Sequence, residues 1–100
     1  MEAAGAQTTD PDGRLVVLDA RARTHLARQR PQMLQHVEAI LGTVHRPDVH
    51  MDDPRSGRER FYRRDLDPGR WLRVIVDFNQ TPAFVVTALV QDNEPQGGTR

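Results

Sequence analysis

The sequence predicts an α+β fold, in which an N-terminal strand and two helices pack on one face of a small, mainly antiparallel sheet of three to five strands. Three observations lead to this prediction. Apolar residues recur with helical spacing in the first half, they alternate in the second half, and turn-forming residues separate the alternating runs. We expect one domain over residues 14–91, with polar, aperiodic and therefore disordered tails at 1–13 and 92–100.

The first strand and the first helix are expected next to each other. The run RLVVLD at residues 14–19 is short and apolar, as in a buried strand. Asp19 is a residue type that caps helix N-termini, and residues 20–29 are rich in helix-forming residues. We therefore expect a helix over residues 20–29 that Asp19 begins.

A second, clearly amphipathic helix is expected over residues 31–44. Pro31 suits its first turn, and apolar residues follow at the spacing of one helical face. These residues are Met33, Val37, Ile40, Leu41 and Val44. The helix is expected to close near Gly42, and residues 45–57 to form a connector with a short strand at 49–51.

A three-stranded meander is expected in the second half. Its strands are residues 58–64, 70–78 and 83–90, and Asp-Pro-Gly at 67–69 is a turn signature. Alternation predicts that the faces carrying Leu72 and Phe84 meet the helices. Arg73 and Thr87 would then point outward from the opposite face.

The charge is unevenly distributed along the chain. The formal net charge is zero, yet residues 14–73 hold 13 arginines against eight acidic residues, a net charge of +5. A mildly basic domain with no cysteine favours an anionic partner and excludes disulfides and thiolate metal sites. No leader peptide or membrane span is visible in the sequence, so we expect a cytoplasmic protein that has no membrane partner.

Arginine and histidine are the candidate functional residues. His25 lies among arginines of the first helix, and an imidazole can exchange a proton near neutral pH. Arg63 shares a strand face with Glu59, and Arg64 shares the other face with Tyr62. These side chains either contact phosphate and bases or form ion pairs on a solvated face. The segment HRPDVHMDDP contains imidazoles and carboxylates but is read as a connector, so we expect no metal and no cofactor.

The motifs THLARQRP, VEAILGTVHRPDV, RERFYRR, WLRVIVDF and FVVTALV occur in an order that resembles a known family. The pattern is similar to the barnase/EndoU/colicin/RelE-like ribonuclease superfamily, in particular its phage- and mobile-element-associated branch. The resemblance covers residues 15–90. It implies a metal-independent endoribonuclease-like domain, toxin-like or phage-related, in which the RNA 2′-hydroxyl attacks the adjacent phosphate.

The resemblance also implies roles for individual residues. His25 would act as general base or acid, Arg63 and Arg73 would clamp the phosphate, and Thr87 would hydrogen-bond a phosphate oxygen. The residues expected to bind substrate are Arg28, Arg30, Tyr62 and Arg64. Glu59 is a further candidate for the second proton transfer.

One departure from the family pattern keeps other functions open. This chain has Gln29-Arg30-Pro31 where the family usually has Arg-His before proline, and arginine cannot exchange a proton at neutral pH. The alternatives are a catalytically weakened module that binds RNA or protein, and an accessory subunit whose open face contacts a neutralising protein partner.

Overall fold

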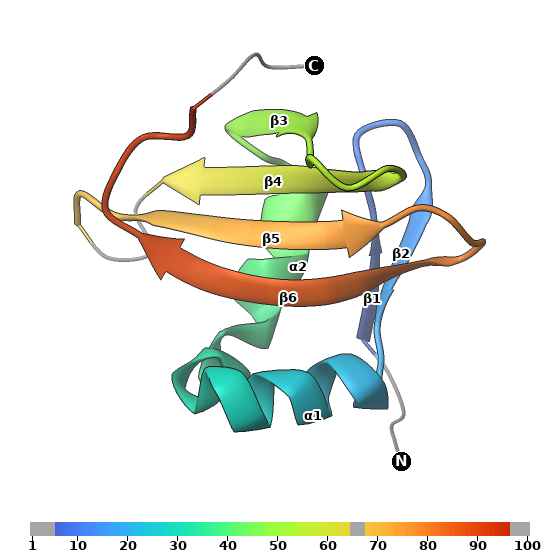
Figure 1. The fold of residues 1–100 in the computed structure, drawn as a ribbon, viewed down its shortest axis with the longest axis horizontal. Coiled ribbons are helices and arrows are strands. Elements are labelled where there is room, and N and C mark those ends of the chain that lie inside the picture. The colour runs from blue at the N-terminus through green and yellow to red at the C-terminus, as the bar shows by residue number, and fades with distance from the viewer. Residues whose placement is uncertain (1–5, 65–67, 97–100) are drawn as a thin grey trace.

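Two α-helices and a six-stranded mixed sheet make up the fold, which a computed structural model describes for residues 6–64 and 68–96 (Figure 1). The strands are β1 (Ala6–Thr9), β2 (Leu15–Leu18), β3 (Val49–Asp52), β4 (Arg58–Arg64), β5 (Trp71–Asp77) and β6 (Ala83–Gln91). The helices are α1 (Ala20–Gln29), the 3₁₀ helix η1 (Pro31–His36) and α2 (Val37–His45). The predicted α+β class is confirmed, but the sheet is larger than the three to five strands expected.

The sheet has the strand order β1-β2-β6-β5-β4-β3. The meander β4-β5-β6 is antiparallel, as predicted, and β2 joins it through a short parallel pairing with the beginning of β6. The strand β1 pairs with β2 inside the segment that was expected to be a disordered tail. That expectation was wrong for residues 6–9, because backbone pairing orders a polar strand that has no apolar pattern of its own. Residues 1–5 and 97–100 lie outside the described part, as do positions 65–67 of the predicted turn.

Both α-helices lie on the same side of the sheet. Helix α2 crosses behind β4 and β5, and α1 lies alongside β6 beyond its short pairing with β2 (Figure 1). Asp19 begins α1 as predicted, because its carboxylate accepts a hydrogen bond of 2.9 Å from the amide of Ala22. Arg30 ends α1. Its carbonyl accepts a hydrogen bond from the amide of Met33, and this bond belongs to the first turn of η1.

The second predicted helix is divided into two parts. Residues 31–36 form η1 rather than the first turns of an α-helix, and α2 itself ends at His45 rather than near Gly42. The tighter 3₁₀ backbone inserts Met33, which is 1% exposed, into the core between the two α-helices. The predicted apolar stripe is confirmed, because all five of its members pack in or against this core.

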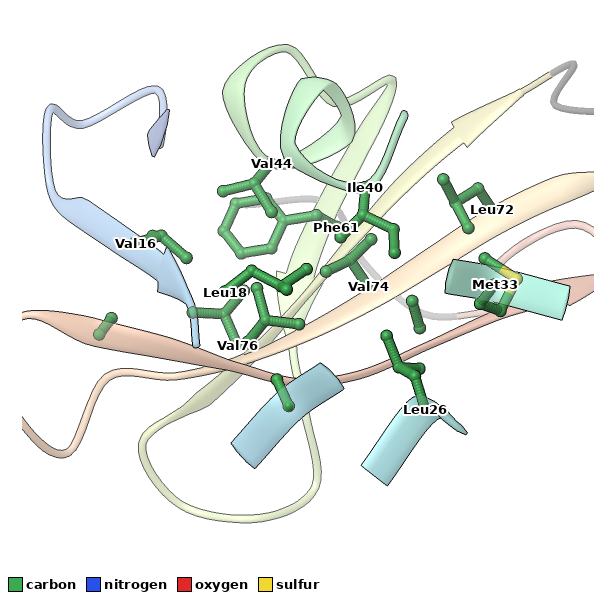
Figure 2. Packing of buried hydrophobic residues seen from close by; sticks show 14 residues of the cluster. Val16, Leu18, Leu26, Met33, Ile40, Val44, Phe61, Leu72, Val74 and Val76 are labelled. Carbon is green, nitrogen blue, oxygen red and sulfur yellow. The ribbon is translucent and has the colours of Figure 1, made fainter. Parts of the chain in front are cut away.

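The core lies between the helices and the sheet, and Figure 2 shows its packing. Phe61 of β4, which is 0% exposed, lies among aliphatic side chains from β2, β5 and α2. The labelled aliphatic members are Val16, Leu18, Leu26, Met33, Ile40, Val44, Leu72, Val74 and Val76. Burial of these side chains supplies the main driving force for holding the helices on this face.

A bulge in β6 changes which of its side chains point inward. The pairing of β5 with β6 shifts register between Ile75 and Val76, so Val85 and Ala88 both face the helices. Phe84 pairs with Asp77 and belongs to the opposite face, which corrects the prediction that Phe84 meets the helices. Thr87 pairs with Ile75 and faces away from the helices, as predicted.

Gly57 is required by the turn before β4. Its φ is +80°, and a Cβ there would overlap the side-chain amide of Asn79, which donates a 3.1 Å hydrogen bond to the carbonyl of Ser56. Gly13 has nearly the same φ, +81°, but a Cβ at this residue would have no described atom within 4 Å. Gly57→Ala should therefore lower the free energy of unfolding by about 2–4 kcal/mol, and Gly13→Ala by about 1 kcal/mol. Urea unfolding of both variants measures the difference, and equal losses would show that Asn79 does not constrain position 57.

Candidate functional site

We use the term outer face for the side of the sheet that points away from the helices. Strand alternation and register assign residues from every strand of the meander to it. They are Arg58, Arg60, Tyr62 and Arg64 of β4, Trp71, Arg73, Ile75 and Asp77 of β5, and Phe84, Thr87, Leu89 and Gln91 of β6. The outer face is therefore rich in arginine, as the sequence predicted.

His25 lines a cavity of about 470 Å³ where α1 meets one end of the outer face. We call it the His25 cavity. Its ionisable lining residues are Asp19, Arg21, His25, Arg58 and Asp77. Apolar surface comes from Phe84 and Val86 of β6. The volume lies within the range of small-ligand sites, so the cavity can hold a group of about nucleotide size.

The chemistry of the His25 cavity comes from three types of side chain. An imidazole, a carboxylate and a guanidinium are present together in His25, Asp77 and Arg58. The Oδ1 atom of Asp77 accepts hydrogen bonds of 2.8 Å from both the backbone and the side-chain amide of Asn79. These bonds fix the carboxylate and leave Oδ2 without a hydrogen-bond partner among the described residues. Such a set can exchange protons and stabilise an anion.

Sequence reasoning missed Arg58 and Asp77 as members of the site. Alternation along residues 70–78 places Asp77 on the same strand face as Arg73, but it does not show which side chains of other strands lie beside Asp77. The missing information was the register, in which Arg58 pairs directly with Asp77. It was also not visible that α1 lies beside β6, which brings His25 to these two strand ends.

The expected phosphate clamp of Arg63 and Arg73 is not formed. In the antiparallel register Arg63 is opposite Leu72, on the helix side, and Arg73 is opposite Tyr62, on the outer face. A Cβ at Gly42 of α2 would lie 3.2 Å from Nη1 of Arg63, so this glycine makes room for the guanidinium. Directly opposed residues share a face, and the two arginines therefore belong to opposite faces of the sheet.

Arg73 and Thr87 do lie close together. Thr87 is opposite Ile75, two residues along β5 from Arg73, so the two side chains are diagonal neighbours on the outer face. The Nε atom of Arg73 and the Oγ1 atom of Thr87 are both buried and have no hydrogen-bond partner within residues 6–64 and 68–96. Buried polar atoms are normally satisfied, so this pair is suited to an oxygen supplied by a ligand or by ordered water.

Tyr62 and Trp71 of the outer face do not form an open surface on which bases could stack. Tyr62 is 1% exposed and Trp71 is 8% exposed, and they pack with Met51 in a small second cluster. Tyr62, which was expected to bind substrate, therefore has a structural role. The guanidinium carbon of Arg64 lies 5.4 Å from the centre of the Trp71 ring, a cation–π contact that leaves Arg64 itself exposed.

The expected substrate-binding residues of α1 are separated. Arg28 is exposed on the helix, and Arg30 lines a second concave region of about 670 Å³, which we call the distal hollow. The distal hollow lies between η1 and the last residues of β6. Its lining includes Arg30, Gln32, Gln35, His36, Arg70 and Leu89.

Glu59 belongs to an ionic cluster on the helix side of β4 and does not line the His25 cavity. It pairs with Val76 and so faces the helix side, and its carboxylate accepts hydrogen bonds of 3.0 and 2.7 Å from Arg14. The hydrogen bonds that Arg14 donates to Glu59 and Asp10 stabilise its charged form more than burial destabilises it, so they raise the pKa of Arg14 above its ordinary value. His50 Nε2 lies 2.6 Å from the same carboxylate. Glu59 therefore joins β4 to the β1–β2 loop, and its expected role in proton transfer has no support in this geometry.

The segment HRPDVHMDDP has structural functions. His45 Nδ1 lies 2.9 Å from the carbonyl oxygen of Thr9. The Asp48 carboxylate accepts a hydrogen bond from the backbone amide of Arg64. Burial raises the pKa of Asp53, but hydrogen bonds from the Arg55 amide and the Arg60 side chain outweigh it and hold this pKa below its ordinary value. Among the described residues, no group of three or more histidines, aspartates or glutamates is arranged to hold a metal ion.

Two further findings complete the description. No helix in the described ranges is long and apolar enough to cross a membrane. Comparison of the chain with family models, curated proteins and solved structures found no match.

Proposed function

We propose that this protein is a metal-independent endoribonuclease-like domain whose reaction centre is the His25 cavity. The observation that carries the proposal is the presence of His25, Asp77 and Arg58 in one cavity of about 470 Å³. Cleavage of RNA by its own 2′-hydroxyl needs an acceptor and a donor for protons, and a cation beside the phosphate. This cavity contains all three.

The proposed reaction assigns one role to each side chain. The Asp77 carboxylate accepts the proton of the 2′-hydroxyl, whose oxygen attacks the adjacent phosphorus. The bond from phosphorus to the 5′-oxygen breaks, and protonated His25 gives its proton to that leaving oxygen. Arg58 stabilises the negative charge of the five-coordinate phosphorus. The products are a 2′,3′-cyclic phosphate and a 5′-hydroxyl end.

Further residues in and beside the cavity contribute to binding in this proposal. Arg21 lines the cavity and adds a second guanidinium for phosphate. Arg73 and Thr87, with their unpartnered buried atoms, are neighbours on the adjoining outer face and hold a phosphate next to the one that reacts. Arg63 has no role in this arrangement, because it points to the helix side.

A second candidate function is an RNA-binding module without turnover. It is favoured by the separation of Arg63 from Arg73 and by the presence of a single histidine among the residues that line the His25 cavity. Such a module would bind RNA with strong salt dependence, because phosphate contacts release counterions. It would leave the RNA intact.

Cleavage of labelled RNA in EDTA tests the proposal. We expect fragments that end in a 2′,3′-cyclic phosphate, no cut at a site carrying a 2′-deoxynucleotide, and a loss of about 10²-fold or more in rate for Asp77→Asn. Asparagine retains the oxygen that accepts from Asn79, so the turn should persist. Glu38→Gln, at an exposed position of α2, is the matched control.

The outcomes of this experiment separate the two candidates. If the RNA stays intact at high protein concentration and binding is sensitive to salt, the protein is an RNA-binding module and the endoribonuclease proposal is wrong. If Asp77→Asn cleaves RNA at the wild-type rate, the His25 cavity is not the reaction centre.

A further inference from the structure

The His25 cavity and the distal hollow lie along the same pair of elements. Val86 lines the first and Leu89 the second, so they are separated by three residues of β6, or about 10 Å. On α1 the corresponding residues are His25 and Arg30, about 7.5 Å apart along the helix axis. The two concave regions therefore both lie along the α1–β6 edge, with the distal hollow at the end of α1.

The side chains of the distal hollow favour an anion. Among the residues that the structure describes, the ionisable side chains of the lining are Arg30, His36 and Arg70, and none is acidic. Arg70 also pairs with Asp92 at 2.9 Å, but the side chains are 43% and 79% exposed, so solvent screens that pair. The carbonyl end of α1 lies here too, and anion binding thus depends on side-chain charge rather than on helix amides.

The unpartnered polar atoms of Thr87 on β6 and Arg73 on the neighbouring β5 lie between the two concave regions along the strands. Thr87 directly follows Val86, and Arg73 is opposite Leu89 in the register. A linear polyanion along this edge would meet His25 and Arg58 first, then Arg73 and Thr87, then Arg30 and His36. Leu89 and the two glutamines of the distal hollow offer an apolar surface and amide groups to a base.

We propose that the distal hollow is a second phosphate and base subsite, and that the ligand is single-stranded RNA lying along β6 from the His25 cavity to this hollow. The inference rests on the proposed function and specifies its substrate class. Single strands fit because their bases are free to enter concave regions, whereas the bases of a duplex remain stacked and paired.

Binding of uncleavable 2′-O-methyl oligonucleotides to the full chain in EDTA tests the inference. We compare a dinucleotide, a single-stranded hexanucleotide and a hairpin duplex. The double variant Arg30→Gln/His36→Gln should weaken hexanucleotide binding about tenfold and reduce its salt slope by about 1, while dinucleotide binding stays unchanged. Arg46→Gln, an exposed arginine at the end of α2, is the matched control and should change neither.

A second measurement locates the ligand directly. Amide resonances of Gln32, Gln35 and Leu89 should shift with the hexanucleotide and stay fixed with the dinucleotide. If these resonances do not move, or if the double variant binds the hexanucleotide as wild type does, the distal subsite is wrong, while RNA cleavage at the His25 cavity stands unaffected. Equal binding of the hairpin would overturn the single-strand assignment. Wild-type protein that binds none of the three oligonucleotides would overturn the proposed function as well.

Discussion

Replacing His25 with alanine should lower the rate of RNA cleavage by about 10²–10⁴-fold, the usual contribution of a general acid or base. His25 supplies the proton that the leaving 5′-oxygen needs, and the lining of its cavity contains no second imidazole to replace it. The variant should bind RNA nearly as tightly as wild type, because Arg21, Arg58 and Arg73 remain. The measurement is the single-turnover cleavage rate, with the protein in excess over the RNA and above the dissociation constant of the complex.

The pH dependence of cleavage distinguishes this role from a structural one. In the proposed reaction the leaving oxygen takes its proton from His25, so the wild-type pH profile should have a limb in which the rate falls with rising pH. The residual activity of His25→Ala should lack that limb. The control is His45→Ala, which loses only an exposed contact with Thr9 and should keep both the rate and the pH profile. A profile that is unchanged in His25→Ala would show that His25 does not transfer the proton.

The variant Glu59→Ala should lose about 2–4 kcal/mol of unfolding free energy. The Glu59 side chain is 9% exposed, accepts two hydrogen bonds from the Arg14 guanidinium and contacts His50. Removing one member of a buried ion pair costs about 3–5 kcal/mol, because the remaining charge loses its partner. The Arg14 side chain is 35% exposed and retains Asp10, so water and that carboxylate reduce the cost.

Urea unfolding measures this loss, with an exposed ion pair of the same chain as the control. The change Asp92→Ala removes one ion-pair partner of Arg70. The Asp92 side chain is 79% exposed and the Arg70 side chain is 43% exposed. It should cost less than about 1 kcal/mol. A domain of this size has about 5–15 kcal/mol in total, so the loss in Glu59→Ala is a large fraction of it. Equal losses in both variants would mean that the Arg14–Glu59 pair behaves as a surface pair.

The local parts of the fold could be predicted from the sequence. Helical spacing found the buried stripe from Met33 to Val44, a cap residue located the start of α1, and alternation placed Arg73 and Thr87 on an outward face. Each of these features depends on near neighbours in the chain. The strand β1 was missed because AQTT carries no apolar pattern, and its order comes from pairing with β2.

The candidate site depended on information that a single strand does not contain. Alternation fixes which side chains share a face within one strand, but it leaves the register between strands undetermined. For that reason Arg63 was assigned to the same phosphate as Arg73, and Arg58 was not connected with Asp77. The bulge in β6 explains the misplaced Phe84, because the extra residue interrupts the alternation, and side chains before and after it no longer follow one pattern.

The position of β6 in the sheet has a consequence for how the chain assembles. This strand lies between β2 and β5 and follows both in the sequence, so the N-terminal hairpin cannot join the sheet until β6 has left the ribosome. The contacts that join the two halves of the sheet therefore span most of the chain, and such long loops must close before burial compensates for their entropy. Nascent chains arrested before Ala83 should consequently expose the inner surface of the meander to chaperones during translation.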